Sequence, residues 1–186
     1  MGVKNLRADI ERYYQLAGVS KSVSGLWLFA ACFNPRLFPN VLLRLSEFFC
    51  KWHMGLIAKF FSMLNVLLFG LEVSPRVEIG GGLFLAHTVG TVIGAERIGC
   101  NVTIMQGVTL GSKEPDIQFT VSTRPVIGNH VLIGAGARII GRVTIGDYAK
   151  IGANAVVLDD VPPYATAAGI SARVIEPKQQ ITDHES

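Results

Sequence analysis

Two side chains in the middle of the chain, His87 and Glu72, have the residue types that general base catalysis requires. A carboxylate that binds one imidazole nitrogen fixes the tautomer of the ring and makes the other nitrogen more basic. That second nitrogen can then take a proton from a hydroxyl group. We therefore interpret His87 as a candidate base and Glu72 as the residue that orients it. An ion pair on the surface of a stable fold, without chemical function, is the alternative.

The element that must position these residues is a six-residue repeat in the second part of the chain. From residue 127 an aliphatic residue recurs at every sixth position, and glycine follows four of the six: Ile127, Ile133, Ile139, Ile145, Ile151 and Val157. The same rhythm is present at Val73, Ile79 and Leu85, then shifts by one residue and resumes at Val92, Ile98, Ile104 and Leu110. A period of six fits neither an amphipathic helix nor a hairpin. It predicts a parallel β-helix with three short faces per coil, whose strands stack about 4.8 Å apart.

A coil of eighteen residues also predicts which residues are neighbours. Leu85 stacks under Ile104 on one face, and another face is predicted to carry Val73, Val92, Leu110, Ile127 and Ile145. His87 falls at a corner where side chains point outward, and Glu72 lies one coil below, with the backbones about 10 Å apart. The segment 112–125 has no six-residue pattern, so we expect it to leave the coil as a loop, near the column of His87 and Gln106.

The first 70 residues have a different composition. Of the 16 aromatic residues, 12 precede Gly70, whereas 15 of the 20 glycines lie between Gly80 and Gly169. We predict a mainly β protein with an α-helical region at 1–70, the β-helix at 71–175 and a short tail at 176–186. The apolar stretch 54–69 needs cover, either from the rest of the protein or a sister subunit, which we favour, or from a membrane surface.

Composition excludes several classes of protein. With 186 residues, 49% of them hydrophobic and 17% charged, the chain is long enough to bury a core and too apolar to be disordered. A net charge of +3 without dense basic runs disfavours nucleic-acid binding. The spacing of Cys32, Cys50 and Cys100 disfavours disulfides and a zinc site. We expect no signal peptide and no transmembrane helix, and a cytoplasmic location that includes the inner face of the membrane.

Three runs of the sequence resemble the serine acetyltransferases and their relatives among the hexapeptide-repeat acyltransferases: GLEVSPRVEIGGGLFLAHTVGTVIG, NVTIMQGVTLGS and IGAGARIIGRVTIGDYAKIGANAVVLDDVPPYATAAGISARVI. The resemblance is close over residues 70 to 175. It implies a left-handed β-helix, a homotrimer, and active sites between subunits where acetyl-CoA lies along the coils. It also implies that His87 is the catalytic base, oriented by Glu72. The implied contacts with coenzyme A are Gly111, Ser112, Ala135, Lys150, Ala153, Thr166, Ala168 and Arg173, although solvated charges and plain coil packing would look the same.

The sequence departs from that family at three places. Ala86 stands where the family has Asp before its catalytic His, and the turn at 94–97 is one residue shorter than usual. The stretch 123–125, Thr-Arg-Pro, replaces Arg-His-Pro, whose His helps to hold the amino-acid acceptor. Arg124 could still clamp a carboxylate, or contact coenzyme A or a sugar acid. Arg124 and Gln106 are therefore candidate acceptor-binding residues.

The resemblance leads us to expect an acetyl-CoA-dependent O-acetyltransferase that works by direct transfer and needs no metal. The acceptor is expected to be L-serine or a sugar hydroxyl of a polysaccharide or its lipid-linked precursor. The changed loop and the apolar helices slightly favour the sugar hydroxyl. A non-catalytic β-helix scaffold is the alternative. A metal-dependent hydratase is disfavoured, because only His87 and His130 lie in the repeat region and their columns differ.

Overall fold

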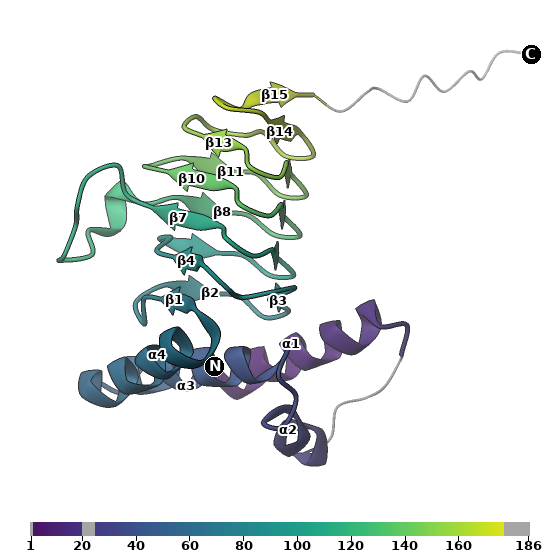
Figure 1. Cartoon of the computed structure of the whole chain (residues 1–186), viewed down its shortest axis with the longest axis vertical. Helices are drawn as coiled ribbons and strands as arrows, with labels where there is room; N and C mark the ends of the chain where they lie inside the picture. The colour runs from purple at the N-terminus through teal and green to yellow at the C-terminus, as the bar shows by residue number, and fades with distance from the viewer. Residues whose placement is uncertain (1, 20–24, 177–186) are drawn as a thin grey trace, which may run out of the picture.

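The protein is a column of stacked coils that stands on a layer of helices (Figure 1). The computed structural model describes residues 2–19 and 25–176. The predicted tail, 176–186, lies outside the described residues except for Glu176. In the described part of the chain, no helix is both long enough and apolar enough to cross a membrane.

The helical layer precedes the coils in the sequence. Its helices are α1 (Gly2–Leu16), α2 (Gly25–Ala31), α3 (Phe38–Lys51) and α4 (Gly55–Phe69). Pro39 lies in the first turn of α3, where its missing N–H costs no helical hydrogen bond. Gly70 ends α4 in the left-handed conformation, with φ of 61°, which glycine adopts without steric cost. The chain then enters the first strand directly.

Short strands form the coils. They are β1 (Leu71–Val73), β2 (Glu78–Ile79), β3 (Phe84–Leu85), β4 (Thr91–Ile93), β5 (Arg97–Ile98), β6 (Thr103–Ile104), β7 (Thr109–Gly111), β8 (Val126–Ile127), β9 (Leu132–Ile133), β10 (Arg138–Ile140), β11 (Thr144–Ile145), β12 (Lys150–Ile151), β13 (Val156–Val157), β14 (Thr166–Ala168) and β15 (Arg173–Ile175). A short 3₁₀ turn, η1 (Val121–Thr123), lies between β7 and β8.

These strands stack into three sheets within the described residues. Sheet A has the order β1-β4-β7-β10-β13, sheet B the order β11-β8-β5-β2, and sheet C the order β15-β14-β12-β9-β6-β3. The pairs are parallel, except that β15 runs antiparallel to β14. The predicted left-handed parallel β-helix with helices at its N-terminal end is therefore confirmed.

The aliphatic residues of the repeat form the core of this column. Ile127, Ile133, Ile139 and Ile145 are each at most 1% exposed. Since each coil brings one such residue to every face, the core is a continuous stack of aliphatic side chains, and their burial is the main source of stability of the coils.

One predicted column is wrong. Leu85 does pair with Ile104 in sheet C, as expected. In sheet A, however, Val73 pairs with Ile93, and Leu110 pairs with Ile139. Ile127 belongs to sheet B. The step from Leu110 to Ile127 crosses a single corner that contains the loop, so the count of eighteen residues does not apply there.

The shift of the repeat by one residue has two opposing causes. Eight positions separate the inward residues Leu85 and Ile93, whereas six separate Ile104 and Leu110, the residues that stack on them in the next coil. The corner between β3 and β4 is therefore longer by two residues. The next step, from Ile93 to Ile98, takes only five positions. For this reason Ile93, and not Val92 as predicted, points into the core.

A buried ionic network joins the helices to the first coil. The guanidinium of Arg44 in α3 donates to both carboxylate oxygens of Asp9 in α1, at 2.9 and 3.0 Å. It also donates to the carbonyl of Ile79 at 2.8 Å, and Asp9 accepts the N–H of Leu83 at 2.8 Å. Burial raises the pKa of Asp9, and Arg44 opposes that rise. This network fixes the orientation of the helical layer on the column.

Candidate active site

His87 lies at the long corner between β3 and β4 and is exposed to solvent. Hydroxyl groups hold the backbone of this corner. Thr88 Oγ1 donates to the carbonyl of Phe69 at 2.9 Å, and Thr91 Oγ1 accepts the N–H of Gly107 at 3.1 Å. The corner is therefore stacked between the end of α4 and the coil above. The imidazole of His87 is exposed there and accessible to a ligand.

Glu72 lies in the centre of β1 and is also exposed. It pairs with Val92 on the outer surface of sheet A, next to the edge that carries His87. Within the described residues no hydrogen bond or ion pair joins the two side chains. Both are free to meet a ligand or each other, and the orienting role of Glu72 stays a prediction.

The edge above His87 is formed by equivalent corners of successive coils. Backbone hydrogen bonds connect these corners: Gly107 N–H to Val89 O at 3.1 Å, Gly136 N–H to Gln106 O at 2.9 Å, and Asn154 N–H to Ala135 O at 2.8 Å. Val89, Gln106, Ala135 and Ala153 therefore stack along one edge of the column, and His87 lies in the lowest of these corners, two residues before Val89. We call this edge, with His87 at its foot, the His87 edge. The small side chains of its upper part leave the backbone open to an extended ligand.

The remaining candidates for coenzyme A contact lie in two places. Lys150 pairs with Thr166, and Ala168 pairs with Arg173, on the outer side of sheet C near the C-terminal end. Lys150 and Arg173 are exposed cations there. Gly111 and Ser112, in contrast, lie at the end of β7 remote from the His87 edge. Of the eight candidates for coenzyme A contact, six thus lie on the His87 edge or on the adjoining outer side of sheet C. Gly111 and Ser112 lie apart from them at the far end of β7.

The loop 112–125 leaves the coil after Gly111, at the corner between sheets A and B (Figure 1). The prediction that it emerges near the column of His87 and Gln106 is therefore wrong. The corners that contain His87 and Gln106 join sheet C to sheet A, and each precedes a sheet A strand. The loop instead follows the sheet A strand β7 and joins it to β8 in sheet B, so the length of β7 separates the loop from Gln106.

Arg124 fixes this loop to the coil. The residue is 7% exposed. Its guanidinium donates to Asp116 Oδ2 at 2.9 Å and to Gly94 O at 2.8 Å. It also lies 3.9 Å from the centre of the Phe119 ring. Burial would raise the pKa of Asp116, but hydrogen bonds from the Thr120 N–H and from Arg124 outweigh it and hold that pKa below its usual value. The role of Arg124 in acceptor binding stays a prediction.

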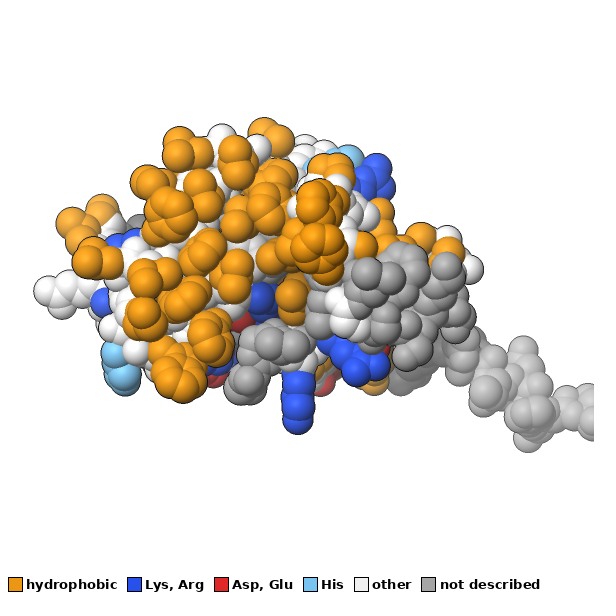
Figure 2. All heavy atoms as spheres, turned by 90° about the horizontal axis from the view of Figure 1, so that it is seen from below, with side chains coloured by type: hydrophobic (Ala, Val, Ile, Leu, Met, Phe, Trp, Pro, Cys, Tyr) orange, Lys and Arg blue, Asp and Glu red, His pale blue; other side chains and the backbone are white. Residues whose placement is uncertain are grey.

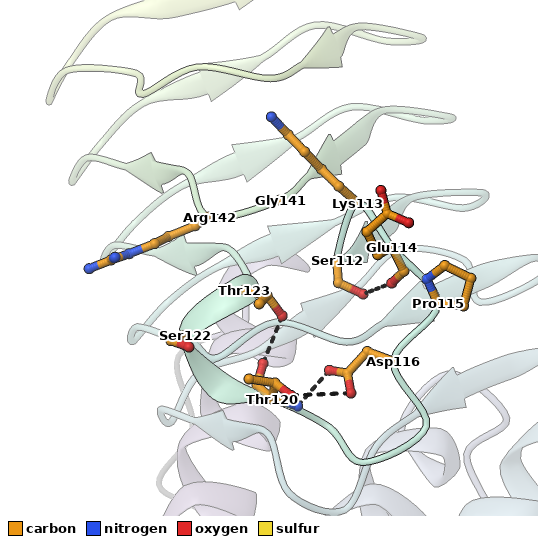
Figure 3. A pocket seen from close by; sticks show the side chains of 10 residues that line it. All are labelled: Ser112, Lys113, Glu114, Pro115, Asp116, Thr120, Ser122, Thr123, Gly141 and Arg142. Carbon is orange, nitrogen blue, oxygen red and sulfur yellow. Dashed lines mark hydrogen bonds between the residues drawn. The ribbon is translucent and has the colours of Figure 1, made fainter.

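Two cavities flank the loop. One, of about 470 Å³, lies between the loop and sheet A, with Glu72, Ser74, Thr109 and Arg124 in its lining; His87 is not part of that lining. The other cavity has a volume of about 480 Å³ (Figure 3). It is lined by the first part of the loop, 112–116, by η1, and by Gly141 and Arg142 at a corner of the next coil. In Figure 3 Asp116 points toward Thr120, which closes the base of the loop.

Sequence reasoning missed Asp116, Phe119 and Thr120, the partners that hold Arg124 and the loop. They lie in a segment without a six-residue pattern, so no periodic signal could have identified them. In the part of the chain that the structure describes, no three or more His, Cys, Asp and Glu side chains gather in a way that could hold a metal ion.

Comparison with known proteins relates the whole column to enzymes of one kind. Residues 124–159 match the family model described as bacterial transferase hexapeptide (six repeats). A serine acetyltransferase of Helicobacter pylori (strain ATCC 700392 / 26695) is 44% identical over 133 residues, which are 71% of this chain and 76% of that protein. A serine acetyltransferase of Staphylococcus xylosus is 43% identical over 121 residues, 64% of this chain and 55% of that protein.

Solved structures agree. A serine acetyltransferase in complex with CoA matches with a TM-score of 0.79 and 30% identity, over 94% of this chain and 69% of that chain. The soybean serine acetyltransferase apoenzyme has the same TM-score of 0.79 and 32% identity, over 92% of this chain and 68% of that chain. The similarity therefore extends through the helical layer as well as the coils.

Proposed function

Because the chain belongs to the serine acetyltransferase family of the hexapeptide-repeat transferases, we propose that it transfers the acetyl group of acetyl-CoA to a hydroxyl group of an acceptor. The 44% identity to the Helicobacter pylori serine acetyltransferase and the match to a structure with bound CoA support this activity. The observation that carries it is the exposed His87 at the foot of an edge of small residues.

His87 acts as the general base in this proposal. Its neutral imidazole takes the proton of the acceptor hydroxyl while the oxygen attacks the thioester carbonyl. Outward backbone N–H groups at the edge of the coils donate to the oxyanion that develops. The C–S bond then breaks, and the proton held by His87 passes to the departing thiolate. Glu72 orients the imidazole and stabilises its protonated form.

The donor is placed along the His87 edge. Ala135 and Ala153 have side chains small enough for an extended chain to lie against the backbone of the coils. Lys150 and Arg173, both exposed, supply positive charge for phosphate groups near the C-terminal end. Thr166 and Ala168 lie beside these cations in β14.

We further propose a homotrimer with active sites between subunits. Gly111 and Ser112 lie away from the His87 edge of their own chain, and a neighbouring subunit could bring them to it. Lysine and arginine side chains on the rim of the adjoining cavity, Lys113 and Arg142, would then face the same cleft. The cytoplasmic location expected from the sequence is part of this proposal.

Two acceptors are consistent with this site. L-Serine is the acceptor that the names of the relatives give. A sugar hydroxyl is the second candidate, and one observation favours it: Arg124 is paired with Asp116 at 2.9 Å, so binding the carboxylate of an amino acid would require that pair to open.

The test is an acetyl-transfer assay. Purified protein is incubated with acetyl-CoA and with L-serine, nucleotide sugars or oligosaccharides, and the release of the coenzyme A thiol is measured. We expect release that depends on one class of acceptor. No release with any of them, together with no binding of coenzyme A in a calorimetric titration, would identify a non-catalytic scaffold instead.

A further inference from the structure

Helix α4 turns its uncharged polar residues inward and most of its large apolar residues outward, with Lys59 as an exposed cation. Asn65 is 1% exposed and donates to the carbonyl of Pro39 at 3.1 Å, and Ser62 donates to the carbonyl of Val73 at 2.7 Å. On the outer side, Leu56 is 85% exposed and Leu67 is 70% exposed. A helix with water on its outer side has the opposite arrangement. The outer side of α4 is therefore built for contact with an apolar partner.

This apolar surface continues onto α3 and the turn between the two helices. Figure 2 shows hydrophobic side chains over most of the helical end of the molecule. We define the apolar end face as the exposed hydrophobic residues of this region: Phe48, Trp52, Met54, Leu56, Ile57, Phe60, Met63, Val66, Leu67 and Leu68. Within α4, residues 56, 60, 63 and 67 recur at helical spacing, so they form one stripe. Monomeric soluble proteins rarely expose a continuous apolar surface of this kind.

Within the segment 25–70, which forms the apolar end face, the exposed charges have one sign. Between Gly25 and Gly70 the exposed Arg and Lys side chains are Arg36, Lys51 and Lys59. The acidic residue of this segment, Glu47, is buried and paired with Arg44 at 2.9 Å. The region therefore presents apolar and aromatic side chains together with basic ones, and no exposed carboxylate of its own.

We propose that the apolar end face binds the surface of an anionic lipid bilayer. Apolar side chains of such a helix enter the boundary between headgroups and acyl chains by about 5–10 Å, and basic side chains attract anionic lipids. Trp52 has the residue type that is enriched at this depth. A second copy of the chain fits less well, because its own basic residues would approach those of the first without acidic partners.

This docking places the candidate active site near the bilayer. The corner with His87 rests on the end of α4 through the hydrogen bond from Thr88 to Phe69. The coils extend from the helical layer toward the C-terminal end (Figure 1). His87 therefore belongs to the first coil, the coil nearest to the membrane. Binding to lipid does not depend on the proposed acetyl transfer, and the two can fail separately.

The experiment is flotation of the full chain with vesicles of phosphatidylcholine alone or of phosphatidylcholine mixed with phosphatidylglycerol. We expect binding to the anionic vesicles and much less to the neutral ones. Leu56→Gln and Leu67→Gln should each weaken binding about tenfold, because each removes a leucine from the apolar contact. Lys51→Gln and Lys59→Gln should each weaken it about fivefold, and only on anionic vesicles.

The matched control is Ile170→Gln, which changes a residue that is 84% exposed at the opposite end of the molecule. It should bind vesicles like the wild-type chain. Sedimentation velocity without lipid is measured in parallel. Absence of binding to both kinds of vesicle would overturn the proposal. So would an assembly that Leu56→Gln and Leu67→Gln dissociate, since the occupant of the face would then be a second copy.

Discussion

His87 combines exposure with a fixed backbone. Thr88 and Thr91 bind the neighbouring layers through their hydroxyls, and Gly90 donates its N–H to the carbonyl of Gly70 at 3.0 Å. The long corner is thus held by hydrogen bonds on both sides although His87 itself is exposed. Such a position suits a base that must reach an external hydroxyl in a defined direction.

The first prediction concerns Glu72. Glu72→Gln should lower kcat about tenfold, less than loss of the base itself, because the amide keeps the shape of the side chain but cannot stabilise a charged imidazole. The pH–rate profile should change together with kcat. Glu78→Gln is the control, since Glu78 is exposed on β2, in a different sheet. A profile that is unchanged in Glu72→Gln would contradict the orienting role.

The second prediction concerns the attachment of the loop by Asp116. Its folded-state pKa lies below the usual value of 3.8, so the attachment is present above that value and is lost as the pH falls through the lowered pKa. Cleavage of the loop by pepsin should therefore stay slow down to about pH 4 and accelerate below it. In Asp116→Asn, cleavage should already be faster than in the wild type at about pH 4 and above, and the two rates should converge as the pH falls below the lowered pKa of Asp116. Equal cleavage rates of the two proteins at about pH 4 and above would show that Asp116 does not hold the loop.

Helices α1 and α3 depend on one buried ion pair for their position on the first coil. Asp9 and Arg44 have side chains that are 0% and 2% exposed. They also bind backbone groups of Ile79 and Leu83. Removing Arg44 leaves Asp9 buried without a cation, and removing Asp9 leaves Arg44 with Glu47 as its carboxylate partner at 2.9 Å; either change costs more than the pair itself contributes.

The third prediction follows from this pair. Asp9→Ala should lower the free energy of unfolding by about 3–5 kcal/mol, because it breaks the buried two-oxygen contact with Arg44 and leaves the Leu83 N–H without its acceptor. Glu11→Ala removes the exposed partner of Arg7 on the same helix and should cost less than about 1 kcal/mol. Urea unfolding followed by circular dichroism measures both. Equal effects of the two substitutions would show that the buried network has no special role.

The fourth prediction concerns the close approach of successive coils. A Cβ at Gly99 would lie 2.6 Å from the backbone of Gly128, which cannot move without disturbing the stack. Gly99→Ala should therefore destabilise the column by about 1–3 kcal/mol. Gly55→Ala, where a Cβ meets nothing within 4 Å, should be tolerated. Thermal unfolding of both variants is the measurement, and a stable Gly99→Ala protein would contradict the packing described.

The repeat alone was sufficient to predict the β-helix, because its period is uninterrupted from Ile127 to Val157 and each aliphatic residue must be buried. The inward residue Ile93 could not be predicted. One corner before it is longer by two residues, the next is shorter by one, and only the net shift is visible in the sequence. Likewise, nothing periodic marks Asp116 or Phe119, whose contacts with Arg124 arise from the folded path of the loop.

The whole molecule has two distinct ends and a lateral edge. The apolar end face lies at the helical end, and the His87 edge runs from the first coil toward the C-terminal end. The proposed trimer completes this edge with Gly111 and Ser112 of another subunit. A single chain is thus expected to fold but not to work alone.

The fifth prediction tests this sharing of sites. Sedimentation velocity in detergent-free buffer should give a mass that is a multiple of three chains of 20.1 kDa. Gly111→Trp places a large side chain where a Cβ meets nothing within 4 Å of its own chain, so the fold should survive while the shared site is blocked. Mixed oligomers of Gly111→Trp and His87→Ala should regain part of the activity. Two inactive variants that stay inactive when mixed would place each site within one chain.

The most direct test of the account is the turnover of His87→Ala with acetyl-CoA and the acceptor found by the thiol-release assay. We predict that this variant folds, binds coenzyme A and loses about 10²- to 10⁴-fold in kcat. His130→Asn, which changes an exposed histidine at a different corner, should keep its activity. Undiminished turnover in His87→Ala would contradict the proposed role of His87 as the base.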